Sequence, residues 1–195
     1  VLLLDEPLAG LSREERITVK QLIAEYCGGM QEGHAFYGYL PGGASGGILP
    51  ASMADEPLDF GTLEQYGCFV GSHAVVILSD QDDLTEAVRN LVRFFRDESC
   101  GQCTPCREGS LWMKKITDRM LLGGGVMQDP GTLKTVADNI AGRTICAFGE
   151  ACAWPTQSFV EKFPEDFAAR ARRVGEPHGG RLPSDGERGL RADPR

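Results

Sequence analysis

The sequence predicts an α+β protein in which a small mixed unit precedes a helical unit. In the first 80 residues, short apolar runs alternate with pairs of glycines, as in short strands joined by tight turns. After residue 80, apolar residues recur at helical spacing. The length of 195 residues and the hydrophobic fraction of 42% suffice for a buried core. We divide the chain into a leader (1–16), a mixed unit (17–80), a helical unit (81–167) and a tail (168–195).

The mixed unit is expected to begin with a helix and to continue as strands. Its first apolar residues follow the i, i+3, i+4, i+7 pattern of an amphipathic helix, at Val19, Leu22, Ile23 and Tyr26. Gly28 and Gly29 are suited to end that helix. The stretch 35–50 predicts short strands joined by glycine turns. A short helix over 62–66 and a strand over 74–78 complete the unit.

The helical unit is expected to hold four helices. The first follows an apolar face that comprises Leu84, Val88, Leu91, Val92 and Phe95. Thr104 and Pro105 provide a cap and a first residue for the second helix, which glycines 123–125 end. The third begins at Asp129-Pro130 and ends at Gly142, and the last covers about 150–163. Because the loops are short, neighbouring helices should be antiparallel, as in a four-helix bundle.

Charge and hydropathy exclude several classes of function. The net charge of −8 argues against nucleic acid as a partner. The tail alone carries +3, is rich in Gly, Pro and Arg, and has few apolar residues, so we expect it to be disordered. No apolar run is long enough for a membrane span or a secretory signal. We therefore expect no membrane insertion and a cytoplasmic location.

The strongest signal is a run of three cysteines at i, i+3 and i+6, namely Cys100, Cys103 and Cys106. Thiols this close together are typical of metal ligands in a reducing compartment. A [4Fe-4S] cluster needs a fourth thiolate, and the position that bacterial ferredoxins use is Ser110 here. Cys146 and Cys152 are the candidates. We favour Cys146, since it falls in a loop, whereas Cys152 falls inside the start of the last helix.

The neighbours of this run suit an anionic cluster. Cys106 falls in the first turn of a helix, whose N–H groups and dipole stabilise negative charge. Gly101 and Gly109 would let the backbone approach the sulfurs, and Arg107 adds positive charge. Polar residues of the loop, Gln102 and Arg107 among them, predict a docking face for partner subunits. The alternative is a zinc-stabilised module without a redox role, although zinc thiolates usually come as two CxxC pairs. Cys27 and Cys68 are expected to be small buried hydrophobes.

Two stretches resemble a known family. SCGQCTPCREG and GRTICAFGEACAWPTQSFVEKFPEDF are similar to the C-terminal part of the NADH-oxidising flavoprotein subunits. That family comprises the complex I 51-kDa subunit, the diaphorase subunit of NAD-reducing hydrogenases and the beta subunit of NAD-dependent formate dehydrogenases. The resemblance covers about 17–167, and ILPASM with LDFGTLEQYG looks closest to the formate dehydrogenase branch. It implies a soluble-ligand-binding β-grasp domain followed by the cluster-binding bundle.

The resemblance also implies cofactors and partners. It places the cluster ligands on Cys100, Cys103, Cys106 and Cys146. It implies FMN and NAD(H) on a preceding domain, which we expect this chain to lack, and an electron relay through the cluster. The partners implied are a thioredoxin-like [2Fe-2S] subunit and a larger iron–sulfur or catalytic subunit. Glycines 42–47 are a weak candidate for a phosphate cradle, because no helix is expected to follow them.

The leader VLLLDEPLAGLSREER resembles a different family, the ATPases of ABC transporters. By that resemblance Asp5 would hold magnesium and Glu6 would orient the attacking water. Such an ATPase also needs a GxxxxGK[ST] loop, which this sequence does not contain. We therefore expect no nucleotide hydrolysis. The leader is a fusion junction, an assembly artefact or a chance match that supplies an edge strand.

Overall fold

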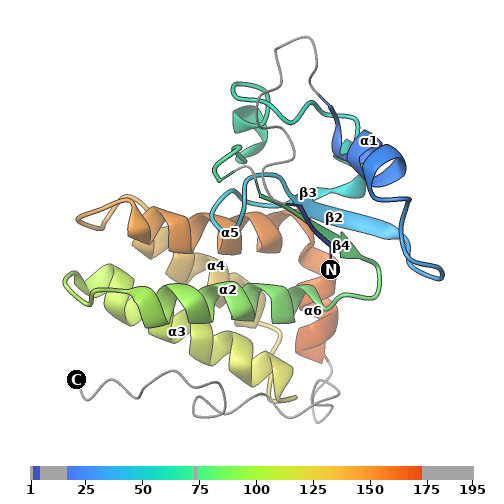
Figure 1. Cartoon of the computed structure of the whole chain (residues 1–195). Coiled ribbons are helices and arrows are strands. Elements are labelled where there is room, and N and C mark those ends of the chain that lie inside the picture. The colour runs from blue at the N-terminus through green and yellow to red at the C-terminus, as the bar shows by residue number, and fades with distance from the viewer. Residues whose placement is uncertain (1, 5–16, 73, 173–195) are drawn as a thin grey trace.

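The structure is a computed structural model that describes residues 2–4, 17–72 and 74–172, with the backbone alone for residues 2–4. Within these residues the chain has the α+β organisation that the sequence predicts, a small sheet packed against helices (Figure 1). The strands are β1 (Leu2–Leu4), β2 (Phe36–Leu40), β3 (Leu49–Pro50) and β4 (Val75–Ser79). The α-helices are α1 (Val19–Gln21), α2 (Leu84–Glu98), α3 (Thr104–Leu121), α4 (Asp129–Ile140), α5 (Phe148–Lys162) and α6 (Pro164–Arg172).

The strands of the described residues form one sheet in the order β1-β4-β2-β3, and every neighbouring pair is antiparallel. The register places Ile77 of β4 between Leu2 of β1 and Tyr39 of β2. The strand expected over 74–78 is present one residue later, as β4. Of the leader, only Leu2–Leu4 is described, as the edge strand β1, and the acidic pair lies outside the described residues.

The glycine-rich loop between β2 and β3 is a turn that packs against another loop. Gly43 and Gly47 have φ values of 81° and 77°, which favour glycine. A Cβ atom on Gly42 would lie 2.0 Å from the carbonyl oxygen of Phe69. The backbone N–H of Phe69 donates to the carbonyl of Gly46 over 3.2 Å. These glycines therefore allow two backbones to touch, and only a 3-10 turn (Ala51–Met53) follows β3.

The first helix differs from the predicted amphipathic helix in its second half. Thr18 caps α1 through a capping box with Gln21, and the chain then continues as a π-helix over Leu22–Tyr26. Val19, Leu22 and Ile23 are buried as expected, but Tyr26 is 70% exposed. A π-helix has more residues per turn than an α-helix, so the spacing i+7 no longer returns to the buried face. The short helix expected over 62–66 is a 3-10 turn over Glu64–Tyr66.

In the described residues five α-helices, α2 to α6, follow residue 80, one more than the four predicted, and the first four begin and end close to the predicted positions. Asp83 caps α2 by accepting hydrogen bonds from the backbone N–H groups of Thr85 and Glu86. The cap of α3 is Cys103 rather than Thr104, so this helix begins one residue earlier than expected. The apolar face of α2 faces the core, with Val88, Val92 and Phe95 buried.

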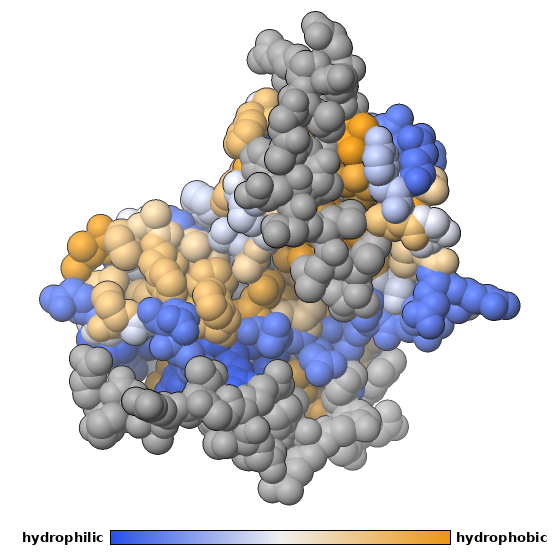
Figure 2. All heavy atoms as spheres, in the orientation of Figure 1, coloured by the Kyte–Doolittle hydropathy of each residue, from blue (hydrophilic) through white to orange (hydrophobic). Residues whose placement is uncertain are grey.

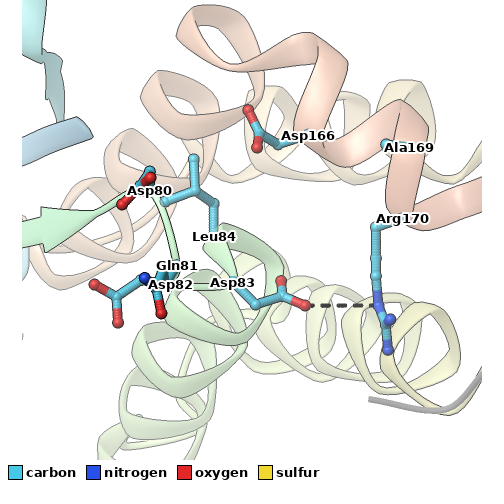
Figure 3. Close-up of a pocket in the computed structure, with 8 residues that line it drawn as sticks. All are labelled: Asp80, Gln81, Asp82, Asp83, Leu84, Asp166, Ala169 and Arg170. Atoms are coloured by element: carbon cyan, nitrogen blue, oxygen red, sulfur yellow. Dashed lines mark ion pairs between the residues drawn. The ribbon is translucent and has the colours of Figure 1, made fainter. Parts of the chain in front are cut away.

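The helical part continues beyond residue 167, which corrects the predicted start of the tail. Helix α6 extends to Arg172, because its last turns contribute to the core. Arg170 is only 5% exposed and donates from Nη2 to the carbonyl of Leu121 over 2.6 Å. Its Nε lies 3.8 Å from Asp83 Oδ2, across a hollow of about 310 Å³ that Figure 3 shows between α6 and the start of α2. Residues 173–195 lie outside the described residues.

Two hydrophobic clusters make up the core. One lies within the mixed unit and includes Val19, Tyr39 and Ile77. The other lies among the helices but also includes Leu40 and Ile48, so the sheet and the helices share buried surface. None of the helices in the described part of the chain is long and apolar enough to cross a membrane.

Candidate iron–sulfur centre

Two loops from distant parts of the sequence lie at the same end of the helices (Figure 1). The loop between α2 and α3 carries Cys100 and Cys103, and Cys106 follows in the first turn of α3. The loop between α4 and α5 carries Cys146, two residues before α5 begins. Cys152 lies within α5, as expected. The fold therefore brings the remote cysteines to the end of the molecule where the run of three lies.

The candidate ligands differ in their exposure to solvent. Cys100 and Cys146 are exposed, Cys103 is partly buried and Cys106 is buried, and all four are free thiols. Exposed apolar side chains flank both loops, with Phe94 on α2 52% exposed and Ile145 76% exposed. Figure 2 shows apolar surface over this end of the molecule, at the left.

The other three candidate thiols all affect the pKa of Cys106. Burial is the main cause that raises the pKa of Cys106. A hydrogen bond with Ser99 lowers this pKa, and negative charge on Cys103, Cys100 and Cys146 raises it. The contributions of Cys100 and Cys103 come from the loop before α3, and that of Cys146 comes from the loop before α5.

The geometry differs from that of a site for a single ion. Within the described residues, no three His, Cys, Asp or Glu side chains lie close enough to hold one metal ion. A [4Fe-4S] cubane does not require that closeness, because each of its four irons binds a different thiolate at a different corner. Free thiols on two loops at one end of the helices are the kind of donors that a [4Fe-4S] cluster uses.

The loop that carries the first two cysteines is held by a side chain of α3. Arg107 donates from Nη1 to the carbonyl of Gly101 over 2.8 Å and from Nη2 to Thr104 Oγ1 over 3.4 Å. Gly101 has a φ of 73°, a conformation that favours glycine, and its carbonyl points to the guanidinium. Arg107 thus fixes the loop in addition to supplying charge, a role that the sequence pattern does not indicate.

Gly109 has a different role from the one expected. A Cβ atom at this position would lie 2.6 Å from Cδ1 and Cγ1 of Ile140 on α4. Gly109 therefore lets α3 and α4 approach each other, and no sulfur is among the nearest neighbours of that position. From the sequence, Gly109 was expected to allow a close approach of the backbone to the sulfurs.

The remaining cysteines are placed apart from the loops. Cys68 is buried, as predicted, and its Sγ lies 3.4 Å from the carbonyl of Ile48 and 3.2 Å from Lys162 Nζ. Cys27 is only partly buried. Cys152 is buried in the helical core, where burial, followed by the charge of Cys106, raises its pKa to about 12.

Comparison with known proteins gives the class of this site. Residues 86–170 match the family described as the NADH-ubiquinone oxidoreductase-F iron-sulfur binding region. This match contains all four candidate ligands. The helical part is therefore similar to iron–sulfur binding regions of that type.

The relatives are subunits of redox complexes. The chain is 37% identical over 165 residues to "NADH dehydrogenase [ubiquinone] flavoprotein 1, mitochondrial" of Dictyostelium discoideum, which covers 84% of this chain and 34% of that protein. It is also 37% identical over 172 residues to "NADH-ubiquinone oxidoreductase 51 kDa subunit, mitochondrial" of Neurospora crassa, which covers 87% of this chain and 35% of that protein. The predicted resemblance to NADH-oxidising flavoprotein subunits is thus confirmed over part of their length. The chain spans about a third of the curated relatives that it matches.

A solved structure shares the fold. The crystal structure of NAD+-reducing [NiFe]-hydrogenase in the air-oxidized state aligns with a TM-score of 0.68 at 23% identity. The alignment covers 87% of this chain and 28% of that one. At this identity the likeness concerns the fold, which extends over both the mixed and the helical parts.

Proposed function

We propose that this chain binds one [4Fe-4S] cluster through Cys100, Cys103, Cys106 and Cys146 and relays electrons through it. The observation that carries the proposal is that the fold brings the loop with Cys100 and Cys103 and the loop with Cys146 to the same end of the helices, where Cys106 lies in the first turn of α3. It is supported by the family match, which spans all four residues.

The residues of the chain suit an anionic redox group. Such a cluster, when bound, takes up and passes on single electrons. The first turn of α3, where Cys106 lies, supplies backbone N–H groups and the positive end of a helix dipole. Burial of Cys106 lowers the local dielectric, and burial and hydrogen bonding are the means by which a protein tunes a cluster.

Cys146 is the better fourth ligand in this proposal. It lies in a loop and is exposed, so that the backbone can adapt to a cluster. Cys152 is fixed within α5 and buried in the apolar core of the helices, so its backbone has less freedom to adapt to a cluster.

We propose further that this relay connects FMN and NAD(H), held on a preceding domain, with partner iron–sulfur subunits. These partners would be a thioredoxin-like [2Fe-2S] subunit and a larger iron–sulfur or catalytic subunit. The names of the relatives support an NADH-linked complex in general. Within it, we propose a β-grasp domain over 17–80, a helical cluster domain from residue 81 to Arg172, closeness to formate dehydrogenase beta subunits and a cytoplasmic location.

Anaerobic reconstitution with iron and sulfide tests the ligand set. The chain should become brown and bind four irons, whereas Ser at any of Cys100, Cys103, Cys106 or Cys146 should lower the iron count. Cys27→Ser is the matched control and should bind a full cluster. A full cluster in Cys146→Ser together with its loss in Cys152→Ser would show that the fourth ligand is Cys152.

The same experiment separates this proposal from its alternative. A zinc-stabilised module would stay colourless and bind zinc in preference to a cluster. A colourless chain that binds one zinc ion after reconstitution would overturn the electron-relay function.

A further inference from the structure

Ser99 is the residue between α2 and the cysteine loop, and its hydroxyl contacts a candidate ligand. Its Oγ lies 3.2 Å from Cys106 Sγ. The same oxygen accepts a hydrogen bond from the backbone N–H of Gly101 over 3.3 Å. The hydroxyl therefore sits between the turn of the loop and the sulfur on α3.

The direction of the hydrogen bond follows from this arrangement. Because the Ser99 oxygen accepts from Gly101, its own hydrogen is available for another acceptor. Cys106 has no proton to give once it is a thiolate ligand, so it can only accept. With a cluster bound, Ser99 would therefore donate to the Cys106 sulfur.

Water cannot replace this hydrogen bond easily. Cys106 is 5% exposed, whereas Cys100 and Cys146 are exposed and can accept hydrogen bonds from solvent. Removal of the hydroxyl would leave a buried anionic sulfur without that donor, and a lost partner in a buried site is costly.

We propose that Ser99 is a positioning residue that raises the reduction potential of the cluster through the Cys106 sulfur. Reduction adds negative charge, part of which falls on the ligand sulfurs, so a hydrogen bond to sulfur stabilises the reduced state more than the oxidised state. The inference rests on the proposed cluster and adds a residue outside its ligand set.

A redox titration of the reconstituted chain, followed by electron paramagnetic resonance, tests this role. Ser99→Ala should bind four irons but be harder to reduce. We expect the ratio of reduced to oxidised cluster at a fixed potential to fall by roughly tenfold, which equals about 59 mV for one electron. Ser99→Thr keeps a hydroxyl and should titrate near the unaltered chain. Ser110→Ala is the matched control, since Ser110 is a buried serine of α3 whose hydroxyl donates to the Arg107 carbonyl.

Each outcome decides the question. Equal potentials in Ser99→Ala and the unaltered chain, with full iron in both, would overturn the tuning role and leave the proposed function intact. Failure of the unaltered chain to bind a cluster would instead contradict the proposed function. If Ser99→Ala binds too little iron, Ser99→Thr and Ser99→Val are compared, since they differ by the hydroxyl alone. Iron loss in Ala and Val but not in Thr would make Ser99 an anchor of the loop and overturn the tuning role.

Discussion

Asp118 shows how single charged residues hold the helices in place. Its carboxylate accepts hydrogen bonds of 2.8 Å from Arg89 Nε on α2 and from Lys114 Nζ on α3. Burial by itself would raise the pKa of Asp118, but the hydrogen bonds and charges of Lys114 and Arg89 outweigh it, so the pKa lies below its ordinary value. The Arg89 side chain is 6% exposed, so this carboxylate neutralises a buried guanidinium.

We predict that Asp118→Asn lowers the free energy of unfolding by about 2 kcal/mol at neutral pH, since a buried charged partner loses its counterion. The sign of the pH dependence follows from the lowered pKa. The stabilisation is present above the pKa of the unfolded state and is lost as the pH falls through the lower pKa of the folded state. Denaturant unfolding at pH 7 and at steps below pH 4 measures it. The difference between the two proteins should shrink with acid, and a constant difference would contradict the assignment.

Arg107 is the second residue with a testable role, because it holds the carbonyl of Gly101. Arg107→Lys keeps the charge but cannot make the same pair of contacts to Gly101 and Thr104. We expect a reconstituted cluster to lose iron to a chelator severalfold faster in this variant. Gln102→Ala, in the same loop and exposed, is the control and should release iron at the unaltered rate. Equal rates in all three proteins would restrict Arg107 to the docking role predicted from sequence.

At the scale of elements, Lys162 at the end of α5 connects the helices to the loops around the sheet through hydrogen bonds. Its Nζ donates to the carbonyls of Ile48 and Tyr66 over 2.8 and 2.7 Å. It also lies 3.1 Å from Ser158 Oγ and 3.2 Å from Cys68 Sγ. One ammonium group thus contacts polar atoms from three parts of the chain, at residue 48, at residues 66–68 and at residue 158.

Replacement of this lysine by methionine should cost about 3 kcal/mol of unfolding free energy, because carbonyls that are shielded from water lose a charged donor. Lys134→Met is the matched control. Lys134 pairs with Asp138 and Glu161 at the surface and should contribute less than about 1 kcal/mol. Urea unfolding of both variants measures the difference. Similar losses would show that the Lys162 contacts add no more than a surface ion pair.

At the scale of the whole molecule, the glycine-rich loop over 42–47 argues against flavin binding by this chain. Gly42 and Gly46 of this loop lie against the backbone of residues 69–71, and no α-helix of the described residues starts directly after the loop. We therefore predict that the purified chain neither retains FMN nor oxidises NADH. Flavin fluorescence after gel filtration and a diaphorase assay with ferricyanide measure this. Stoichiometric bound FMN, or NADH-dependent reduction of ferricyanide, would contradict the prediction.

The sequence predicted those features that depend on local chemistry. The apolar spacing on α2, and the Thr-Pro step at the start of α3, placed Cys106 in a first helical turn, as the structure confirms. Gly142 and the residues after it placed Cys146 in a loop. What could not be predicted depends on contacts between distant residues. Three such contacts are the hydrogen bonds of Lys162, the burial of Arg170 in α6 and the close approach of Gly109 to Ile140. Each brings together segments that are far apart in the sequence, and the residue pattern within one segment does not indicate which distant segment it contacts.

The meeting of two distant loops at one end of the helices has a further consequence under the proposed ligation. Iron would close the span from Cys106 to Cys146, which contains most of α3 and all of α4. Such a closure removes conformations from the unfolded chain, as a covalent cross-link does, and the binding free energy becomes folding free energy. Damage to the cluster by oxygen would release both loops at once. A protease that cuts exposed loops would then degrade the empty protein first, so that turnover in the cell would follow the state of the iron.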